Sequence, residues 1–492
     1  MKALLLYPEF PDTFWSFKHA LKFIRKRSSQ PPLGLLTVAS LLPAGWEKRL
    51  VDQNIEPLHR DDLAWADVVF VSAMVAQREA AVQAIARCKA AGVRVVAGGP
   101  LFTGEHEHFP EVDHFVLNEA ELTLPLFLAD LAAGRPQHLY TTSEFPDIRQ
   151  TPRPLWELVK FRYYDSMGVQ FSRGCPFNCE FCNVTALFGH RPRTKTAAQL
   201  VEELDALYAL GWRKGIFFVD DNFIGNQKQL KAEILPALIA WRQDKIGMSF
   251  STEVSINLAD DPELLDLMVA AGFHTVFIGI ETPNEASLVE CNKSQNQQRN
   301  LLTSVKRIQQ AGLQVQGGFI VGFDSDSPNI FEQQKEFIQR SGIVTAMVGL
   351  LQAPYGTRLY ERMKRAGRLT DEMSGDNTDG STNIMPLMGL ETLREGYKKL
   401  MVQLYAPRQY YDRVRAFLRE YKPPRIQFHL ELQHVLAFFR SVYHLGIRSE
   451  ERAEYWRLVG WTLLHRPALF PLAITLAIYG FHFRQVFRLY VA

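Results

Sequence analysis

The sequence of 492 residues contains little cysteine: there are five in all, and three of them fall within positions 175–182. So few cysteines exclude a framework of several disulfides and indicate a reducing compartment, so we expect a cytoplasmic protein. The chain also lacks a large excess of charge of either sign, because its 55 basic residues nearly balance its 53 acidic residues. Without a global positive field, nucleic acid is not expected as a partner.

The chain lacks an apolar run long enough to span a bilayer. Residues 1–8 are too short for the apolar region of a signal peptide and contain no cleavage site, so they predict a buried first strand. The longest apolar stretch, 468–481, holds 14 residues, whereas a spanning helix needs about 20. This stretch is interpreted as a core helix of a C-terminal bundle. The alternative is a peripheral contact with a membrane or a lipid substrate, which would make the protein membrane-associated.

A Gly-x-Gly-x-x-Gly motif after the first strand is missing too, which disfavours a nicotinamide or flavin dinucleotide. In residues 1–135, short apolar runs alternate with helical stretches, which predicts a doubly wound, Rossmann-like parallel sheet. Ligands of such sheets bind at the carboxyl ends of the strands. The residues predicted at those ends include Asn54, Ser72, Met74, Gly98, Gly99 and Glu119. A tight turn is the alternative interpretation of Gly98-Gly99.

The three clustered cysteines have the spacing Cys175-x3-Cys179-x2-Cys182. Three thiolates on a [4Fe–4S] cluster would leave one iron open to a small molecule. Ferredoxin-type sequences use four cysteines, so electron transfer alone does not explain a set of three. Three alternatives remain at this point: a zinc site with His190 as fourth ligand, a redox pair with a spare thiol, and three buried side chains.

Residues 165–360 predict six further βα units, with strands at 168–171, 215–219, 248–252, 275–280, 317–321 and 345–350. Six parallel strands form a partial barrel rather than the closed eight of a TIM barrel. Polar residues again follow the strands, among them Asp220, Asp221, Glu253 and Glu281. Each alone could be a helix cap or a solvated turn, but together they predict one functional rim.

The cysteine segment resembles the signature of the radical S-adenosylmethionine (SAM) superfamily, with Phe181 at its aromatic position and Arg173-Gly174 before it. The resemblance implies that SAM chelates the open iron and yields a 5′-deoxyadenosyl radical. Asp220-Asp221 stand where the family often has Gly-Gly-Glu, so the contact to the SAM amino group departs from the usual one. Carried over by position, the SAM-binding residues are Phe181, Asp220, Asp221, Glu253, Glu281, Gly317 and Gly318, and the cluster ligands are Cys175, Cys179 and Cys182.

The loops of residues 1–135 resemble those of the cobalamin-binding domain that precedes many radical SAM modules. The resemblance implies cobalamin contacts from Asn54, Ser72, Met74, Gly98, Gly99 and Glu119. Many such domains supply a lower axial histidine from Asp-x-His-x-x-Gly, but the corresponding segment here is Asp52-Gln53-Asn54-Ile55-Glu56. Cobalamin is therefore expected base-off, without a histidine ligand.

Together the two modules resemble the class B radical SAM methyltransferases, the group of the hopanoid C-2 and bacteriochlorophyll methylases. The resemblance implies methylation of an unactivated carbon of a bulky, hydrophobic substrate through the 5′-deoxyadenosyl radical and methylcobalamin. It also implies a flavodoxin- or ferredoxin-like electron donor. One alternative is an oxidase, cyclase or rearrangement enzyme with the same cofactors, and another is a non-catalytic metal- or cobalamin-binding regulator. A methylthiotransferase is disfavoured, because only Cys88 and Cys291 remain for a second cluster.

These inferences divide the chain into four parts: a cobalamin-binding domain at 1–135, a proline-rich linker at 136–164, a radical SAM partial barrel at 165–360, and a mostly helical region at 361–492. Cys291 is interpreted as an ordinary buried residue, with a radical-quenching thiol as the alternative.

Overall fold

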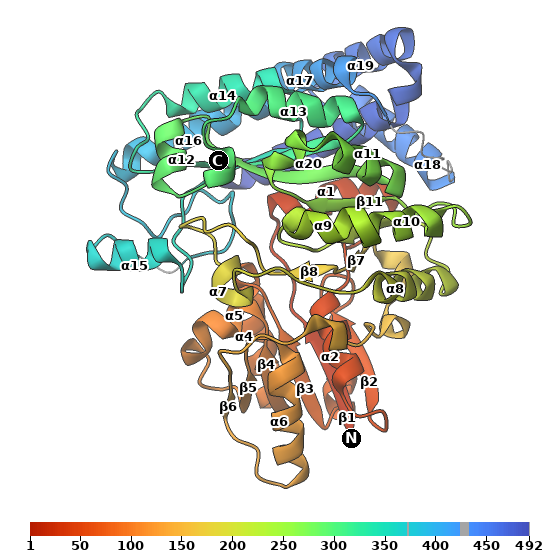
Figure 1. Ribbon diagram of the computed structural model, residues 1–492, viewed down its shortest axis with the longest axis vertical. Helices are drawn as coiled ribbons and strands as arrows, with labels where there is room; N and C mark the ends of the chain where they lie inside the picture. The colour runs from red at the N-terminus through yellow and green to blue at the C-terminus, as the bar shows by residue number, and fades with distance from the viewer. Residues whose placement is uncertain (371–372, 424–431, 492) are drawn as a thin grey trace.

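Two parallel β-sheets follow one another along the chain, and helices of the C-terminal region pack against the second sheet (Figure 1). The computed structural model describes residues 1–370, 373–423 and 432–491. The predicted fold class is confirmed in each of its three parts.

The first sheet has the strand order β2-β1-β3-β4-β5-β6, with every pair parallel. Its apolar strands are covered on both faces by helices, as expected of a doubly wound sheet. The covering helices include α2 (Leu33–Leu41), α4 (Arg78–Ala90), α5 (Pro100–Glu105) and α6 (Ala120–Ala132). The strands are β1 (Lys2–Tyr7), β2 (Glu47–Asp52), β3 (Val68–Ser72), β4 (Arg94–Gly98), β5 (His114–Val116) and β6 (Leu139–Tyr140). Strand β6 was not predicted; it lies within the proposed linker.

The second sheet has the order β14-β13-β12-β11-β10-β7 and is also parallel throughout. Its edge strands β7 and β14 do not pair with each other, so the sheet is a partial barrel. The strands are β7 (Ser166–Val169), β10 (Gly215–Phe218), β11 (Phe250–Glu253), β12 (Phe273–Glu281), β13 (Gln314–Val321) and β14 (Ala346–Leu350). The outer helices include α8 (Ala197–Ala209), α10 (Leu235–Arg242), α11 (Pro262–Ala271), α12 (Glu285–Glu290), α13 (Leu301–Ala311) and α14 (Ile330–Ser341).

The C-terminal region is helical, as predicted. Its described helices are α15 (Arg358–Arg365), α16 (Leu390–Tyr405), α17 (Pro407–Glu420), α18 (Leu432–Ser441), the π-helical turn η12 (Val442–Arg448), α19 (Arg452–His465) and α20 (Phe470–Val491). The apolar stretch 468–481 begins just before α20, and Ala473, Ile474 and Leu476 are buried in the main core. The core-helix interpretation of this stretch is therefore confirmed. No helix in the described parts of the chain combines the length and apolarity that crossing a membrane requires.

A segment between β1 and α2 joins the first domain to the C-terminal helices. It contains the short helices η1 (Phe14–Ser16), α1 (Lys18–Leu21) and η2 (Lys22–Ile24), and α1 packs on α20. The ring of Phe14 stacks on that of Phe483 with centroids 4.1 Å apart. His482 shares a hydrogen bond of 3.0 Å with the carbonyl oxygen of Phe14. Residues more than 460 positions apart are thus in one core.

Candidate active site

A cavity of about 2500 Å³ is lined by residues at the carboxyl ends of both sheets, and it also reaches the amino ends of the second sheet's strands at Ser166, Gly215 and Gln314. Pockets for single small ligands usually measure about 300–1,000 Å³, so this cavity has room for more than one large molecule. All six cobalamin-binding residues predicted above line it, together with Phe181, Asp221, Glu253, Glu281 and Gly318. Asp220 and Gly317 do not line it.

The cysteine loop leaves the end of β7 through a sharp turn at Gly174. The φ angle of Gly174 is +92°, and a Cβ there would lie 2.9 Å from three carbonyl oxygens of residues 188–191. Glycine is therefore required where the loop begins. A second segment supports the loop: the backbone N–H of Glu180 donates to the carbonyl oxygen of Cys291 at 2.8 Å, and the Asn292 amide donates to that of Asn178 at 2.8 Å.

The cysteines of the loop are partly exposed free thiols that lie close enough to interact electrostatically. Burial raises the pKa of Cys182 to about 12, so cluster binding would release a proton from this group. Among the described residues, no three His, Cys, Asp or Glu side chains converge closely enough to hold one metal ion, and His190 is exposed. Three thiols on one loop match the donor set of a [4Fe–4S] cluster in which each cysteine binds its own iron.

Lys293 is a charged neighbour of the cysteines that the sequence reasoning missed. Its Nζ donates to Glu281 Oε1 at 2.6 Å and lies 5.9 Å from the ring centroid of Phe181. Burial alone would lower the pKa of Lys293, but its electrostatic interactions, with Glu281 above all and then with Cys179, outweigh burial and raise the pKa. No motif marks Lys293; its position two residues after Cys291 was the only local signal.

Glu281 has a left-handed backbone, with φ of +62°, at a register shift between β12 and β13. Such a conformation is uncommon for a residue other than glycine. It turns the end of β12 so that the Glu281 carboxylate meets Lys293 at the edge of the cavity. The predicted rim residue is therefore present, but it is already paired with a cation.

The two adjacent acids after β10 have different surroundings. Asp220 is buried and accepts hydrogen bonds from the backbone N–H of Phe171, at 3.1 Å, and from the Ser172 hydroxyl, at 2.6 Å. It thus holds the start of the cysteine loop. Asp221 faces the cavity instead, and burial raises its pKa to about 6.

Glu253 lines the cavity at the end of β11. Burial, with smaller contributions from the charges of Asp221 and Asp220, raises the pKa of Glu253 to about 8. Two acids whose pKa values are both raised are suited to meeting a cationic ligand, because a positive charge would stabilise their ionised forms.

Gly318 permits close approach to the cavity from β13. A Cβ on Gly318 would lie 2.8 Å from the Phe277 ring, and one on Gly317 would lie 2.8 Å from the Phe319 ring. Both positions exclude a side chain, but only Gly318 faces the cavity.

On the opposite wall, Gly98 and Gly99 follow β4. A Cβ on Gly98 would lie 2.5 Å from the carbonyl oxygen of Val116, and one on Gly99 would collide with the Ser72 hydroxyl. Internal packing therefore accounts for both glycines, although both also line the cavity. The Asn54 side chain, in turn, accepts from the Phe10 N–H at 2.9 Å and donates to Asp52 at 2.7 Å.

Glu119 joins the two sheets through ion pairs. Its carboxylate lies 2.5 Å from Arg173 and 2.7 Å from Arg193, and Arg173 also lies 2.9 Å from Glu121. All four side chains are largely buried. Arg173 stands two residues before Cys175, so this network fixes the cysteine loop to the first domain.

Aromatic side chains from three regions form part of the cavity wall: Trp15, Phe17, Phe277 and Tyr479. The Trp15 indole donates to the Met347 sulfur at 2.8 Å and meets the Phe277 ring edge-on, with centroids 5.4 Å apart. The rings of Phe17 and of Tyr479 in α20 pack together, with their centroids 4.9 Å apart. The sequence reasoning missed these residues, because they meet only through the fold.

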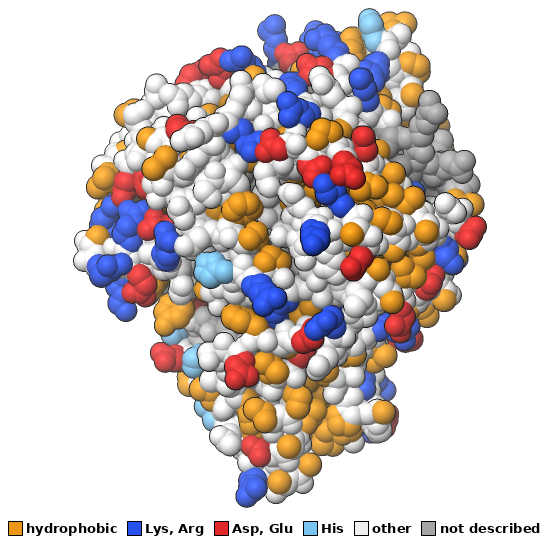
Figure 2. All heavy atoms as spheres, in the orientation of Figure 1, with side chains coloured by type: hydrophobic (Ala, Val, Ile, Leu, Met, Phe, Trp, Pro, Cys, Tyr) orange, Lys and Arg blue, Asp and Glu red, His pale blue; other side chains and the backbone are white. Residues whose placement is uncertain are grey.

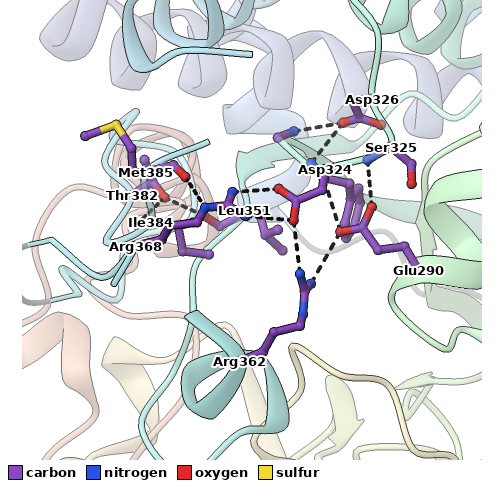
Figure 3. Close-up of polar contacts among 12 residues, drawn as sticks. Glu290, Asp324, Ser325, Asp326, Leu351, Arg362, Arg368, Thr382, Ile384 and Met385 are labelled. Atoms are coloured by element: carbon purple, nitrogen blue, oxygen red, sulfur yellow. Dashed lines mark hydrogen bonds and ion pairs between the residues drawn. The ribbon is translucent and has the colours of Figure 1, made fainter. Parts of the chain in front are cut away.

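A charged cluster supports the cysteine loop from outside the cavity. Arg362 of α15 binds both carboxylate oxygens of Glu180, at 2.8 and 2.9 Å. Figure 3 shows Arg362 reaching toward Asp324 and Glu290, with Arg368 on the other side of Asp324. Because Glu180 lies between Cys179 and Cys182, α15 is tied directly to the loop.

Comparisons with known proteins match three parts of the chain. Residues 26–128 match the B12 binding domain, residues 169–338 match the radical SAM superfamily, and residues 357–492 match a domain of unknown function, DUF4070. The first match covers β2 to β5 of the first sheet, and the second covers β10 to β13 of the second sheet.

Several curated proteins are similar along most of the chain. An uncharacterized methyltransferase of Synechocystis sp. is 42% identical over 99% of this chain and 92% of its own. The hopanoid C-2 methylase of Rhodopseudomonas palustris is 32% identical over 93% of this chain and 88% of its own. A bacteriochlorophyllide d C-12(1)-methyltransferase of Chlorobaculum tepidum is 26% identical over 76% of this chain and 82% of its own.

Among solved structures, the cobalamin-dependent SAM radical enzyme OxsB has the same fold. Its TM-score is 0.62 at 14% identity, covering 99% of this chain and 80% of that one. At this identity the likeness concerns the fold alone.

Proposed function

The chain belongs to the cobalamin-dependent radical SAM methyltransferases, and on that premise we propose that it methylates an unactivated carbon of a bulky, hydrophobic substrate. Membership of this family sets aside a non-catalytic regulator. The [4Fe–4S] cluster, SAM and cobalamin follow from the two matched domains.

One observation carries the proposal: a single cavity is lined by Phe181 of the cysteine loop, by the cobalamin-side loops and by an aromatic wall, although the three cysteines themselves are not among its lining residues. When bound, SAM on the cluster supplies a radical that removes hydrogen, and cobalamin supplies a methyl group. The residues of this chain would hold them: the three cysteines for the cluster, Asp221 and Glu253 near the SAM amino group, and the loops at Ser72 and Gly98 for cobalamin. The remaining aromatic and apolar wall excludes water and suits a hydrophobic substrate.

We also propose that cobalamin binds without a histidine below the cobalt. Among the described cavity-lining residues of the first domain there is no histidine, which supports this proposal. Titration of the cob(II)alamin form followed by electron paramagnetic resonance tests it, because a nitrogen ligand would split the cobalt signal.

Isotope transfer tests the proposed reaction. The reconstituted enzyme would be incubated with methyl-labelled SAM, a reductant and lipid or pigment extracts from a strain lacking the gene. A product heavier than its precursor by one CH2 group plus the mass of the label supports methylation. An unlabelled, oxidised or cyclised product would instead establish the oxidase or cyclase alternative.

Reduction of the cluster requires an electron donor, for which we propose an acidic flavodoxin- or ferredoxin-like protein in the cytoplasm. Exposed Arg358, Lys364 and Arg365 on α15 support this, because α15 is hydrogen-bonded to the cysteine loop through Leu359 and Glu180 at 3.0 Å. Figure 2 shows basic side chains gathered over α15, at the left of the view.

A further inference from the structure

The outer face of α18, continued by Tyr443 of η12, carries a stripe of large apolar side chains. Leu432, Val435, Leu436, Phe439 and Tyr443 are 75, 44, 39, 61 and 48% exposed. Their spacing of three or four residues places them on one side of the helix. Large apolar residues scattered singly on a surface are ordinary, but a continuous stripe of five marks an interaction surface.

The inner face of the same helix forms part of the cavity wall. Gln433, His434, Ala437 and Phe438 line the cavity from α18, and Leu472, Ile474 and Ile478 line it from α20. Val435 lines the cavity and is also exposed, so the stripe reaches the cavity mouth. A single helix therefore separates an apolar outer surface from the space proposed for a hydrophobic substrate.

The two segments that form and flank the stripe are basic, and the acidic residue Asp165 lies near their Lys26 and His434. Residues 432–448 contain no acidic residue, and neither do residues 13–46. The second range includes η2, which packs against α18: Arg440 donates to the carbonyl oxygen of Phe23 at 2.5 Å, and the Phe23 and His444 rings lie 5.5 Å apart. Lys22 and Arg25, on either side of Phe23, are exposed.

We propose that α18 and η12 rest on an anionic lipid bilayer, with the apolar stripe at the boundary of headgroups and acyl chains and the basic residues among the headgroups. An amphipathic helix with a basic flank is suited to this position. A hydrophobic substrate dissolved in the bilayer would then enter the cavity beside Val435. This inference rests on the proposed function for the nature of the substrate. The sequence analysis considered residues 468–481 as a membrane contact, but this stretch is largely buried. We therefore assign the contact to α18 instead.

Vesicle flotation tests the docking directly. The full chain, purified anaerobically with its cluster, is mixed with vesicles of phosphatidylcholine containing phosphatidylglycerol, or with phosphatidylcholine alone. We expect binding to the anionic vesicles that weakens with salt. The pair F439D and Y443D should weaken it about tenfold or more, because each change removes apolar burial. The changes K22E and R25E should each weaken it at least fivefold.

A control is L126D, which adds one aspartate, where the pair adds two, at an exposed leucine of α6, at the lower end of the molecule in Figure 1. This variant should float like the unaltered protein. Absence of binding, or equal binding by the F439D/Y443D variant, overturns the proposal. If that variant instead changes the oligomeric state, the stripe contacts a second copy of the chain and the bilayer proposal is likewise overturned. Flotation needs no turnover, so its failure is distinct from a failure of methyl transfer.

Discussion

Arg173 and Glu119, 54 residues apart in the chain, are joined by an ion pair of 2.5 Å between the cysteine loop and the first domain. Both side chains are almost completely buried. The loop that would carry the cluster is therefore fixed with respect to the loops that would hold cobalamin, and the two cofactors would keep a set separation.

The change E119Q tests this connection. It leaves two buried guanidinium groups with less compensating charge, so we expect a loss of about 3 kcal/mol in the free energy of unfolding. Urea denaturation followed by two probes measures it. The control E157Q alters the exposed pair of Glu157 with Arg153 and should change stability by less than about 0.5 kcal/mol. Equal effects of the two variants would show that the buried network adds no stability.

Alanine replacement of each cysteine separates cluster ligands from buried thiols. C175A, C179A and C182A should each lose the iron and the cluster absorbance after anaerobic reconstitution, because each removes one of only three ligands. C291A and C88A, at buried positions, should keep the iron. Iron retention in C179A, or its loss in C88A without unfolding, would contradict the assignment.

Removal of the Lys293 charge should make the cluster harder to reduce. K293M removes a cation that interacts with Cys179 and Cys182, so added negative charge on the cluster is less stabilised and the midpoint potential should fall. Each loss of about 1.4 kcal/mol of attraction lowers a one-electron potential by about 59 mV. A redox titration followed by electron paramagnetic resonance measures this shift.

Two further variants separate the effect of the Lys293 charge from the effect of leaving its partner Glu281 unpaired. K293R keeps the charge and should leave the potential nearly unchanged. The pair K293M and E281Q avoids an unpaired buried carboxylate and should restore much of the potential, since it removes both charges. A potential that is insensitive to all three changes would exclude an electrostatic role for Lys293.

The raised pKa of Glu253 predicts a pH-dependent stability. Because the folded pKa is about 8 and the unfolded value is about 4.3, the folded protein binds the extra proton and loses stability as pH rises between those values. E253Q removes this loss and should stabilise the ligand-free protein increasingly from pH 5 to 8. The side chain is half-buried, so we expect about 1–2 kcal/mol at pH 8.

Urea midpoints from pH 5 to 9 check this prediction, with the exposed E395Q as a control that should show no trend. A gain from E253Q that is the same at pH 5 and pH 8 would refute the raised pKa.

Charge reversal on α15 tests the proposed donor surface. The triple change R358E, K364E and R365E should slow cluster reduction by an acidic flavodoxin about tenfold or more at low salt, because it removes electrostatic steering. The triple change R394E, K398E and K399E on α16 alters net charge equally at exposed positions and should have little effect. Reduction by dithionite should be the same in both variants; a deficit there would indicate damage to the cluster instead.

The sequence predicted features that depend on neighbouring residues and missed those that depend on distant ones. Apolar runs such as Val68–Ser72 and the cysteine spacing are local, so both sheets and the cysteine loop were predictable. Local patterns could not tell that Asp220 turns inward while Asp221 faces the cavity. Local patterns also could not predict that Trp15 contacts Met347, 332 residues away, or that Lys293 lies near the cysteines.

The segment between β1 and α2 has a consequence for how such proteins diversify. It lies within residues 1–135, which we assign to cobalamin binding, although the matched B12 binding domain begins at residue 26. Trp15 and Phe17 lie in the cavity wall, and Phe14 is in the core with α20. Exchanging that part between relatives would therefore also replace a piece of the substrate wall and break its contact with the C-terminal helices. In evolution the three regions are expected to change together, as one inherited unit, rather than as interchangeable modules.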